Sequence, residues 1–309
     1  MEEFLKARST AGSFLSCDFV WRVVELPRYL QSCNLWKLKF PLIIVSMITL
    51  SILANAGGVG KSTLAIHLAY AVSRLGFSVV ILDLDPQHSI DRFCGLPPTE
   101  SRLSIAQILG SKDFDGEWPL IPAWEDQIRV LQSHIDLAQV SSDLATRRRG
   151  SYKLHDHLNN YPLDCDVVII DCPATLGMLY ENALAASDLI LVPVQLEPKS
   201  IGGAADLVQW CITASNELHL EPRPKVLGIV PSIYNKDAAI HRQYLEQLPG
   251  IAAQLDIKVY PPIRYSKEFV NTSAYGLPLH KYRPGHPACI DFEIITTDLV
   301  ALLKEKIVV

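Results

Sequence analysis

The stretch Asn55-Ala56-Gly57-Gly58-Val59-Gly60-Lys61-Ser62-Thr63 decides the fold. The apolar run Met47–Ala54 precedes it, and the helix-like segment Thr63–Leu75 follows it. Between a strand and a helix, the backbone N–H groups of a glycine-rich loop can point at phosphate oxygens, helped by the helix N-terminus. Lys61 would reach the β- and γ-phosphates, and the Ser62 hydroxyl would ligate Mg²⁺. The stretch therefore predicts a phosphate-binding loop for a nucleotide and Mg²⁺.

The rest of the chain repeats one pattern, an apolar run that ends in a polar or turn residue. The run Phe77–Leu82 ends in Asp83, and the run 166–170 ends in Asp171. Two further runs show the same pattern, 189–193 before Gln195 and 226–230 before Pro231. Helix-like stretches occur between and after these runs, at 104–109, 137–147, 179–186, 201–218 and 238–248, and a closing helix is expected at 287–305. Continuous β-branched runs are typical of strands covered on both faces. The alternation predicts an α/β fold with a doubly wound, mostly parallel sheet, that of a P-loop NTPase, with its site at the carboxyl ends of the strands.

Two aspartates at strand ends complete the predicted site. Asp171 follows Val-Val-Ile-Ile, as does the aspartate that holds Mg²⁺ in P-loop NTPases, usually through a water. Asp83 would lie on the neighbouring strand, where its carboxylate can orient the attacking water. An aspartate that closes an apolar run is often only a turn or cap residue, so the glycine loop upstream is what favours the catalytic interpretation.

Composition bounds the class of protein. The 309 residues are 49% hydrophobic and 20% charged, as in an ordinary globular chain, and the net charge of −5 argues against a surface that coats nucleic acid throughout. Seven scattered cysteines without a C-x-x-C pair fit free thiols in a reducing cytoplasm. We expect an N-terminal extension at 1–46, disordered or a mis-called start, and an ATPase domain at 47–309. The uncharged run 40–56 ends inside the loop, which argues against a membrane span.

Several segments resemble the ParA/MinD ATPases, whose loop has the deviant form K-G-G-x-G-K-[ST]. The matching segments are Asp83-Leu-Asp-Pro-Gln87, Asp166–Gly177, Val194–Glu197 and Tyr275–Pro278, so the resemblance runs from Met47 to the C-terminus. It implies an ATPase that binds ATP with Mg²⁺, forms a face-to-face homodimer in ATP and binds DNA without sequence preference. An adaptor protein then stimulates slow hydrolysis. The resemblance assigns phosphate and Mg²⁺ binding to Gly57, Gly58, Val59, Gly60, Lys61, Ser62, Thr63 and Asp171, hydrolysis to Lys61 and Asp83, and the adenine pocket to Pro231 and Pro262.

The loop departs from the family at Ala56, where relatives carry a signature lysine that crosses the dimer to the other subunit's phosphates. Either that coupling is lost or another cation replaces it, because triphosphate charge must be compensated. Lys199 is the candidate, since it follows a strand end on the rim of the site and begins a small-residue helix. The substituted loop and the Glu-Pro-Lys-Ser segment resemble a branch of ParA proteins that distributes carboxysomes on the nucleoid, with plasmid partition as the near neighbour.

Two basic clusters are candidates for DNA phosphates. They are Arg147–Arg149 and the group of Arg264, Lys267, Lys281 and Arg283, although a charge run is usually a solvated face. We expect a cytoplasmic, nucleoid-associated protein without stable membrane insertion. Three alternatives stay open: a MinD-like membrane-associated ATPase, a small-molecule kinase or synthetase, and an electron-transferring relative of the nitrogenase iron protein. The last ranks lowest, because no cysteine pattern suggests a cluster.

Overall fold

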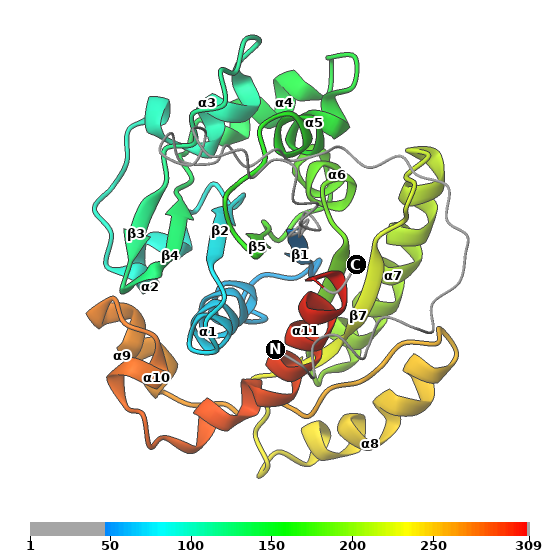
Figure 1. Ribbon diagram of the computed structural model, residues 1–309. Helices are drawn as coiled ribbons and strands as arrows, with labels where there is room; N and C mark the ends of the chain where they lie inside the picture. Colours follow the sequence, from blue (N-terminus) through cyan, green and yellow to red (C-terminus); the bar gives the residue numbers. More distant parts are fainter. Residues whose placement is uncertain (1–46, 308–309) are drawn as a thin grey trace, which may run out of the picture. The chain divides into compact units, whose positions relative to one another are not determined.

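The computed structural model describes residues 47–307, so the predicted N-terminal extension at 1–46 lies outside the described residues. Within that range the core is a seven-stranded sheet with strand order β3-β4-β2-β5-β1-β6-β7 (Figure 1). The strands are β1 (Ile48–Ile52), β2 (Val79–Asp83), β3 (Ile121–Ala123), β4 (Glu125–Leu131), β5 (Val167–Asp171), β6 (Leu189–Gln195) and β7 (Lys225–Ser232). All neighbours pair in parallel except β3 and β4, which confirms the predicted mostly parallel α/β sheet.

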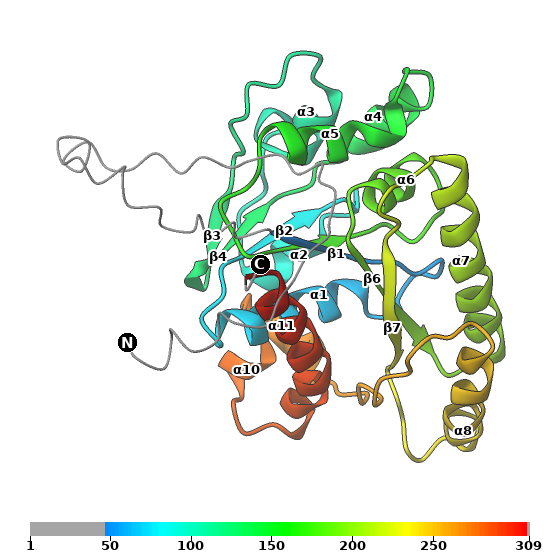
Figure 2. The same cartoon turned by 45° about the vertical axis from the view of Figure 1, so that its right-hand side comes forward.

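Helices cover both faces of the sheet. One hydrophobic cluster joins alternate strand residues to α1 (Lys61–Ser73), α2 (Ser89–Cys94) and α11 (Glu293–Ile307). The other cluster joins the opposite strand residues to α3 (Ile105–Gly110), α4 (Leu137–Leu144), α5 (Lys153–Asn160), α6 (Met178–Ala185) and α7 (Pro198–Glu217). Figure 2 shows α7 and α8 (Ala239–Ala253) along the β7 side of the sheet. Because both faces are covered, every residue of β1, β2 and β5 is buried, as their continuous apolar runs predict.

The expected strands at β1, β2, β5, β6 and β7 are all present, and so are the expected helices. The closing helix differs in detail, since a 3₁₀ turn (Pro287–Phe292) precedes α11. The pattern gave no expectation for β3, β4, α2, α5, α9 (Glu268–Tyr275) or α10 (Leu279–Tyr282). These elements are short, or, like β4, mix charged with apolar residues at the flank of the sheet, so their sequence lacks a clear period. No helix within residues 47–307 is long and apolar enough to cross a membrane.

Candidate nucleotide site

The glycine-rich loop leaves the carboxyl end of β1 and enters α1 directly. Gly58 and Gly60 have φ values of 74° and 89°, which side-chain-bearing residues rarely adopt. Lys61 is the first residue of α1 and is only 7% exposed. Its Nζ donates a hydrogen bond to the carbonyl oxygen of Ala56 at 3.2 Å. The ammonium group is therefore folded back over the loop, where it can meet phosphate oxygens.

Three side chains from distant elements hold this loop in place, and no local sequence pattern indicates that they contact it. The Tyr180 hydroxyl, on α6, accepts from the Ala54 N–H at 3.1 Å and donates to the Ala54 carbonyl at 2.6 Å. At the ends of β6 and β7, Gln195 Nε2 donates to the Gly58 carbonyl at 3.4 Å and Ser232 Oγ donates to the Val59 carbonyl at 2.7 Å. Such anchors pre-organise a loop for binding, because its backbone carbonyls are then already fixed.

Asp83 and Asp171 lie side by side at the carboxyl ends of β2 and β5, where they are register partners. Both side chains are fully buried. Burial raises the pKa of Asp171 to about 7, although the nearby Ser62 hydroxyl and the Lys61 ammonium lower it. Burial, with the charge of Asp171 added, raises the pKa of Asp83 well above its usual range. A cation bound between these two carboxyl groups would favour their charged forms and so offset the effect of burial.

The residues present fit Mg²⁺. Neither carboxylate oxygen of Asp171 has a well-formed hydrogen bond to any residue in 47–307, although both are buried. The Ser62 hydroxyl lies beside this carboxylate and lowers its pKa. Oxygen ligands of this kind, few in number and completed by phosphates and waters, are what Mg²⁺ prefers. Within the described residues no cluster of three histidine, cysteine or acidic side chains forms a separate metal cage.

A cavity of about 170 Å³ lies beside the loop and is mostly apolar. Its lining comes from the loop and α1, from the ends of β6 and β7, and from the segment before and within α9, namely Gly58, Gly60, Thr63, Leu64, Pro193, Ser232, Ile233, Ile263, Arg264, Tyr265, Ser266, Phe269 and Val270. Pro231 and Pro262 each precede a lining residue but do not line the cavity themselves. The Ile263 N–H donates to the Pro231 carbonyl at 2.8 Å, which ties the two walls together.

Lys199 lies in the first turn of α7 and is exposed. It forms no ion pair with another described residue. The start of α7 borders the loop closely, since Ser200 and Ala204 line the same small hollow as Asn55 and Ala56. Gly203 of α7 faces Asn55: a Cβ at this position would lie 2.9 Å from Asn55 Oδ1, so the Asn55 side chain would have to shift.

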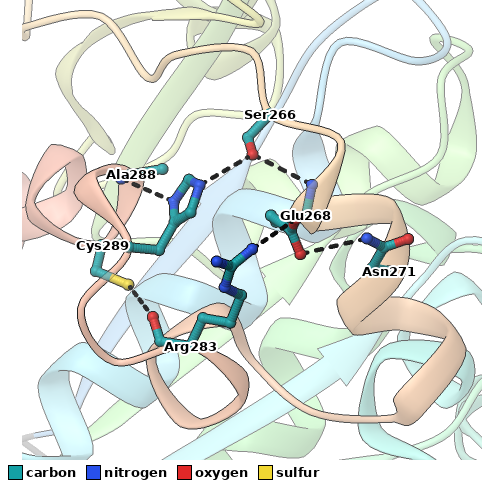
Figure 3. A network of polar contacts seen from close by, with 7 residues as sticks. Ser266, Glu268, Asn271, Arg283, Ala288 and Cys289 are labelled. Atoms are coloured by element: carbon teal, nitrogen blue, oxygen red, sulfur yellow. Dashed lines mark hydrogen bonds and ion pairs between the residues drawn. The ribbon is translucent and has the colours of Figure 1, made fainter.

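The structure divides the basic clusters into engaged and free side chains. Arg264 forms a two-pronged ion pair with Asp291 at 2.6 and 2.7 Å. Arg283 pairs with Glu268 at 2.8 Å, in a polar network that also contains Ser266 and Asn271 (Figure 3). In the other cluster, Arg147 donates to the Gly110 carbonyl at 2.9 Å, and Arg149 pairs with Asp156. Most of these arginines therefore fasten segments of the fold together.

Comparison with known proteins assigns the family. The AAA domain family matches residues 47–221. The chromosome partitioning protein ParA of Caulobacter vibrioides is 30% identical, with 69% of this chain and 79% of that protein covered. The chain belongs to the ParA/MinD family of P-loop ATPases.

The structure of apo McdA from Cyanothece superposes with a TM-score of 0.72 and a sequence identity of 20%. The match covers 80% of this chain and 97% of that one. At this level of identity the likeness is evidence for the fold alone. A structure named as cobyrinic acid a,c-diamide synthase, from Mycobacterium smegmatis, is 28% identical, with a TM-score of 0.64 and coverage of 77% and 97%. As a member of the ParA/MinD family, the chain is an ATPase, with ATP and Mg²⁺ as its cofactors.

Proposed function

We propose that this ParA/MinD-type ATPase positions a cargo by forming an ATP sandwich dimer that binds DNA without sequence preference. A partner protein would stimulate hydrolysis and release the dimer. The observation that carries the proposal is Lys199, an exposed cation in the first turn of α7, beside a loop in which Ala56 replaces the family's signature lysine. The rim of the site thus offers a positive charge that no described residue neutralises.

The charge balance of the site supports a cross-subunit role for Lys199. Lys61 is held inside its own loop by the Ala56 carbonyl, so a bound triphosphate would have room for a further cation at the rim. A further cation from a second copy of the chain would stabilise the bound phosphates, as an arginine finger does in GTPases. Because Lys199 lies at the surface, it is free to reach the phosphates of the facing subunit and so couple ATP to dimerisation.

The test is the oligomeric state of matched lysine variants, measured by light scattering with size-exclusion chromatography in ATP and Mg²⁺. An Asp83→Ala background slows hydrolysis during the run. We expect Lys199→Ala to weaken the ATP-dependent dimer about tenfold, the order of one lost charge-assisted contact. Lys304→Ala is the control, since Lys304 is exposed on α11. A Lys199→Ala protein that dimerises like the control would refute the cross-subunit role.

For DNA, the proposed contacts are the exposed cations that the fold does not already pair. Lys267 and Arg148 meet this description within residues 47–307, whereas Arg264 and Arg283 are held by acidic partners. Each lysine that neutralises a phosphate adds about one unit to the salt slope of binding. We expect ATP-dependent binding to random-sequence duplex that weakens with salt, and a slope smaller by about one unit in Lys267→Ala. Binding that does not change with salt would contradict a phosphate contact.

We propose carboxysomes on the nucleoid, in the cytoplasm, as the cargo and place, with plasmid partition as the alternative. The loop substitution at Ala56 and the segment Glu197-Pro-Lys-Ser200 support this choice. Affinity purification from native cells in ATP tests it. Recovery of a carboxysome adaptor supports the first cargo, and recovery of a centromere-binding protein supports plasmid partition instead.

Simple assays distinguish two other functions, a small-molecule synthetase and a membrane-associated ATPase, from the proposed one. The likeness to the M. smegmatis structure favours a small-molecule synthetase as the second candidate, whose ATP turnover would rise with a metabolite and not with DNA plus a partner protein. A MinD-like membrane ATPase would need a free basic C-terminal helix. In α11, Lys306 is engaged by Asp188 at 3.2 Å, which does not support that reading. Sedimentation with anionic liposomes in ATP measures it directly.

For the base, we propose that adenine occupies the apolar cavity beside the loop, with Pro231 and Pro262 shaping its walls from behind. Apolar walls with few polar groups suit a planar base. Ile263→Trp would fill this cavity, since Ile263 is only 5% exposed and lines it. A wild-type affinity for ATP in that variant would place the base elsewhere.

A further inference from the structure

Trp124 lies in the turn between β3 and β4 and has a backbone conformation that bulky residues rarely adopt. Its φ value is 44°, in the left-handed region. Such a conformation costs free energy, so it persists only where surrounding contacts hold it. Here the indole Nε1 donates a hydrogen bond to the Gly276 carbonyl at 2.6 Å, and the ring lies edge-on to the Tyr70 ring of α1, with the centroids 6.3 Å apart. The strained turn is therefore bonded to a segment 152 residues further along the chain.

Gly276 lies at the end of α9, where this helix packs against the end of α2. Gly276 follows the last residue of α9 and Gly95 follows the last residue of α2, and both have a φ value of 63°. The two backbones approach so closely that a Cβ on Gly276 would lie 2.4 Å from the Gly95 Cα. A side chain at position 276 would therefore push the two helix ends apart. Figure 1 shows α9 next to α2, on the β3–β4 side of the molecule.

The other end of α9 forms a wall of the cavity beside the phosphate loop. Ser266, just before the helix, and Phe269 and Val270 in its first turn line this cavity. Phe269 also lies edge-on to the His67 ring of α1, with the centroids 5.0 Å apart. With eight residues, α9 is a rod about 12 Å long. The placement of Gly276 at one end therefore sets the placement of the cavity wall at the other.

We propose that Trp124 is a positioning residue for nucleotide binding, which fixes α9 through Gly276 and so sets the cavity wall that meets the base. The inference rests on the proposed place of adenine in this cavity. The phosphate loop is held by other side chains, those of Tyr180, Gln195 and Ser232. Loss of the Trp124 contact should therefore weaken the hold on the base and leave the phosphates bound as before.

The test compares the dissociation constants of ADP and of pyrophosphate, each with Mg²⁺, by isothermal titration of the full-length protein. ADP carries the base, whereas pyrophosphate can contact the loop alone. We expect Trp124→Phe, which keeps a ring but lacks the indole N–H, to weaken ADP binding roughly fivefold and pyrophosphate binding by less than about twofold, as for one lost hydrogen bond. Trp118→Phe is the matched control, because its indole donates to the Tyr161 carbonyl at 2.9 Å within the other hydrophobic cluster. This control should bind both ligands like the wild type.

Gly276→Ala tests the same role without a change at Trp124. Its Cβ would push α9 away from α2, so ADP should bind more weakly than in Gly76→Ala, with pyrophosphate binding alike in the two variants. Gly76 is the matched control, since its φ value of 92° is also in the left-handed region but a Cβ there meets open space. The two variants share the backbone strain and differ in the contact. This pair keeps the test decisive if thermal unfolding shows that Trp124→Phe does not fold.

The outcomes separate the site of the base from the role of Trp124. If Ile263→Trp, which fills the cavity, binds ADP like the wild type, the base lies elsewhere and the inference fails with it. If Ile263→Trp binds ADP weakly while Trp124→Phe and Gly276→Ala bind it as their controls do, only the positioning role is overturned. Equal weakening of ADP and pyrophosphate would show a general structural effect and overturn it too.

Discussion

The Tyr180 hydroxyl offers a direct test of how the fold holds the phosphate loop. Ala54 is the last buried residue before the loop. Within residues 47–307, both its N–H and its carbonyl form their hydrogen bonds with the Tyr180 hydroxyl. Tyr180 is fully buried, so water cannot replace a lost hydroxyl without rearrangement. Tyr180→Phe removes the oxygen and leaves the ring in place.

The expected loss follows from two buried backbone groups left without partners. Each costs on the order of 1–3 kcal/mol, so the free energy of unfolding should fall by about 3 kcal/mol, a large part of the roughly 5–15 kcal/mol of a typical domain. Tyr70→Phe is the matched control. Tyr70 is also buried, at 6% exposure, but its hydroxyl makes no hydrogen bond to any residue that the structure describes. Its loss should change stability by less than about 0.5 kcal/mol.

The assay is urea unfolding of both variants, followed by titration with a fluorescent ATP analogue. Because Ala54 leads directly into Asn55 and the loop, we expect Tyr180→Phe to weaken nucleotide binding as well, whereas Tyr70→Phe should not. A Tyr180→Phe protein that unfolds at the same urea concentration as Tyr70→Phe would refute the reasoning. If the two variants unfold at the same urea concentration but Tyr180→Phe binds the ATP analogue more weakly, the stability argument fails and only the role of the hydroxyl in ordering the loop stands.

Gly203, Ser232 and His67 each make a contact whose change can be measured. Gly203→Ala should displace the Asn55 side chain, because its Cβ would lie 2.9 Å from Asn55 Oδ1, and so should weaken ATP binding more than Gly202→Ala, which meets open space. Gly202→Ala should stabilise α7 by up to about 1 kcal/mol. Isothermal titration and thermal unfolding compare the two variants, and equal ATP affinities would count against a role for the Asn55 side chain. Ser232→Ala should weaken ATP binding with little effect on the sheet, because it frees the Val59 carbonyl, and wild-type affinity would count against that anchor. Burial lowers the pKa of His67 to about 3 from 6.5, so the folded state excludes its proton: stability should be fully present above pH 6.5 and fall by up to about 1.4 kcal/mol per pH unit towards pH 3, a slope that His67→Gln should reduce.

The sequence predicts the central strands and the loop well, because these elements carry their signal locally. Continuous apolar runs mark β1, β2 and β5, and the glycine pattern marks the loop whatever surrounds it. The pairing of Asp83 with Asp171 also follows, since parallel strands end at the same edge of a sheet. By contrast β4, with the sequence EDQIRVL, resembles a surface segment until its neighbour β2 is known.

The parts of the site that sequence could not predict are the long-range anchors. Ser232 and Val59 are separated by 173 residues, and Tyr180 and Ala54 by 126, so no local pattern joins them. Lys199 could be predicted only in part. The sequence indicates its position just after a strand end, but its exposure depends on how α7 packs.

These anchors explain how a loop of small residues can bind a highly charged ligand without collapsing. Glycines with positive φ lose much conformational freedom on folding, so such a loop needs outside support. Here the support comes from hydrogen bonds that Tyr180 on α6, Gln195 on β6 and Ser232 on β7 make to backbone groups of the loop and of the residue before it. These hydrogen bonds hold the backbone at Ala54, Gly58 and Val59 and do not involve the side chains of Asn55 and Ala56. On the proposed role of Lys199, the cross-subunit cation would lie on the rim of the site, while the hydrogen bonds that hold the loop backbone stay unchanged.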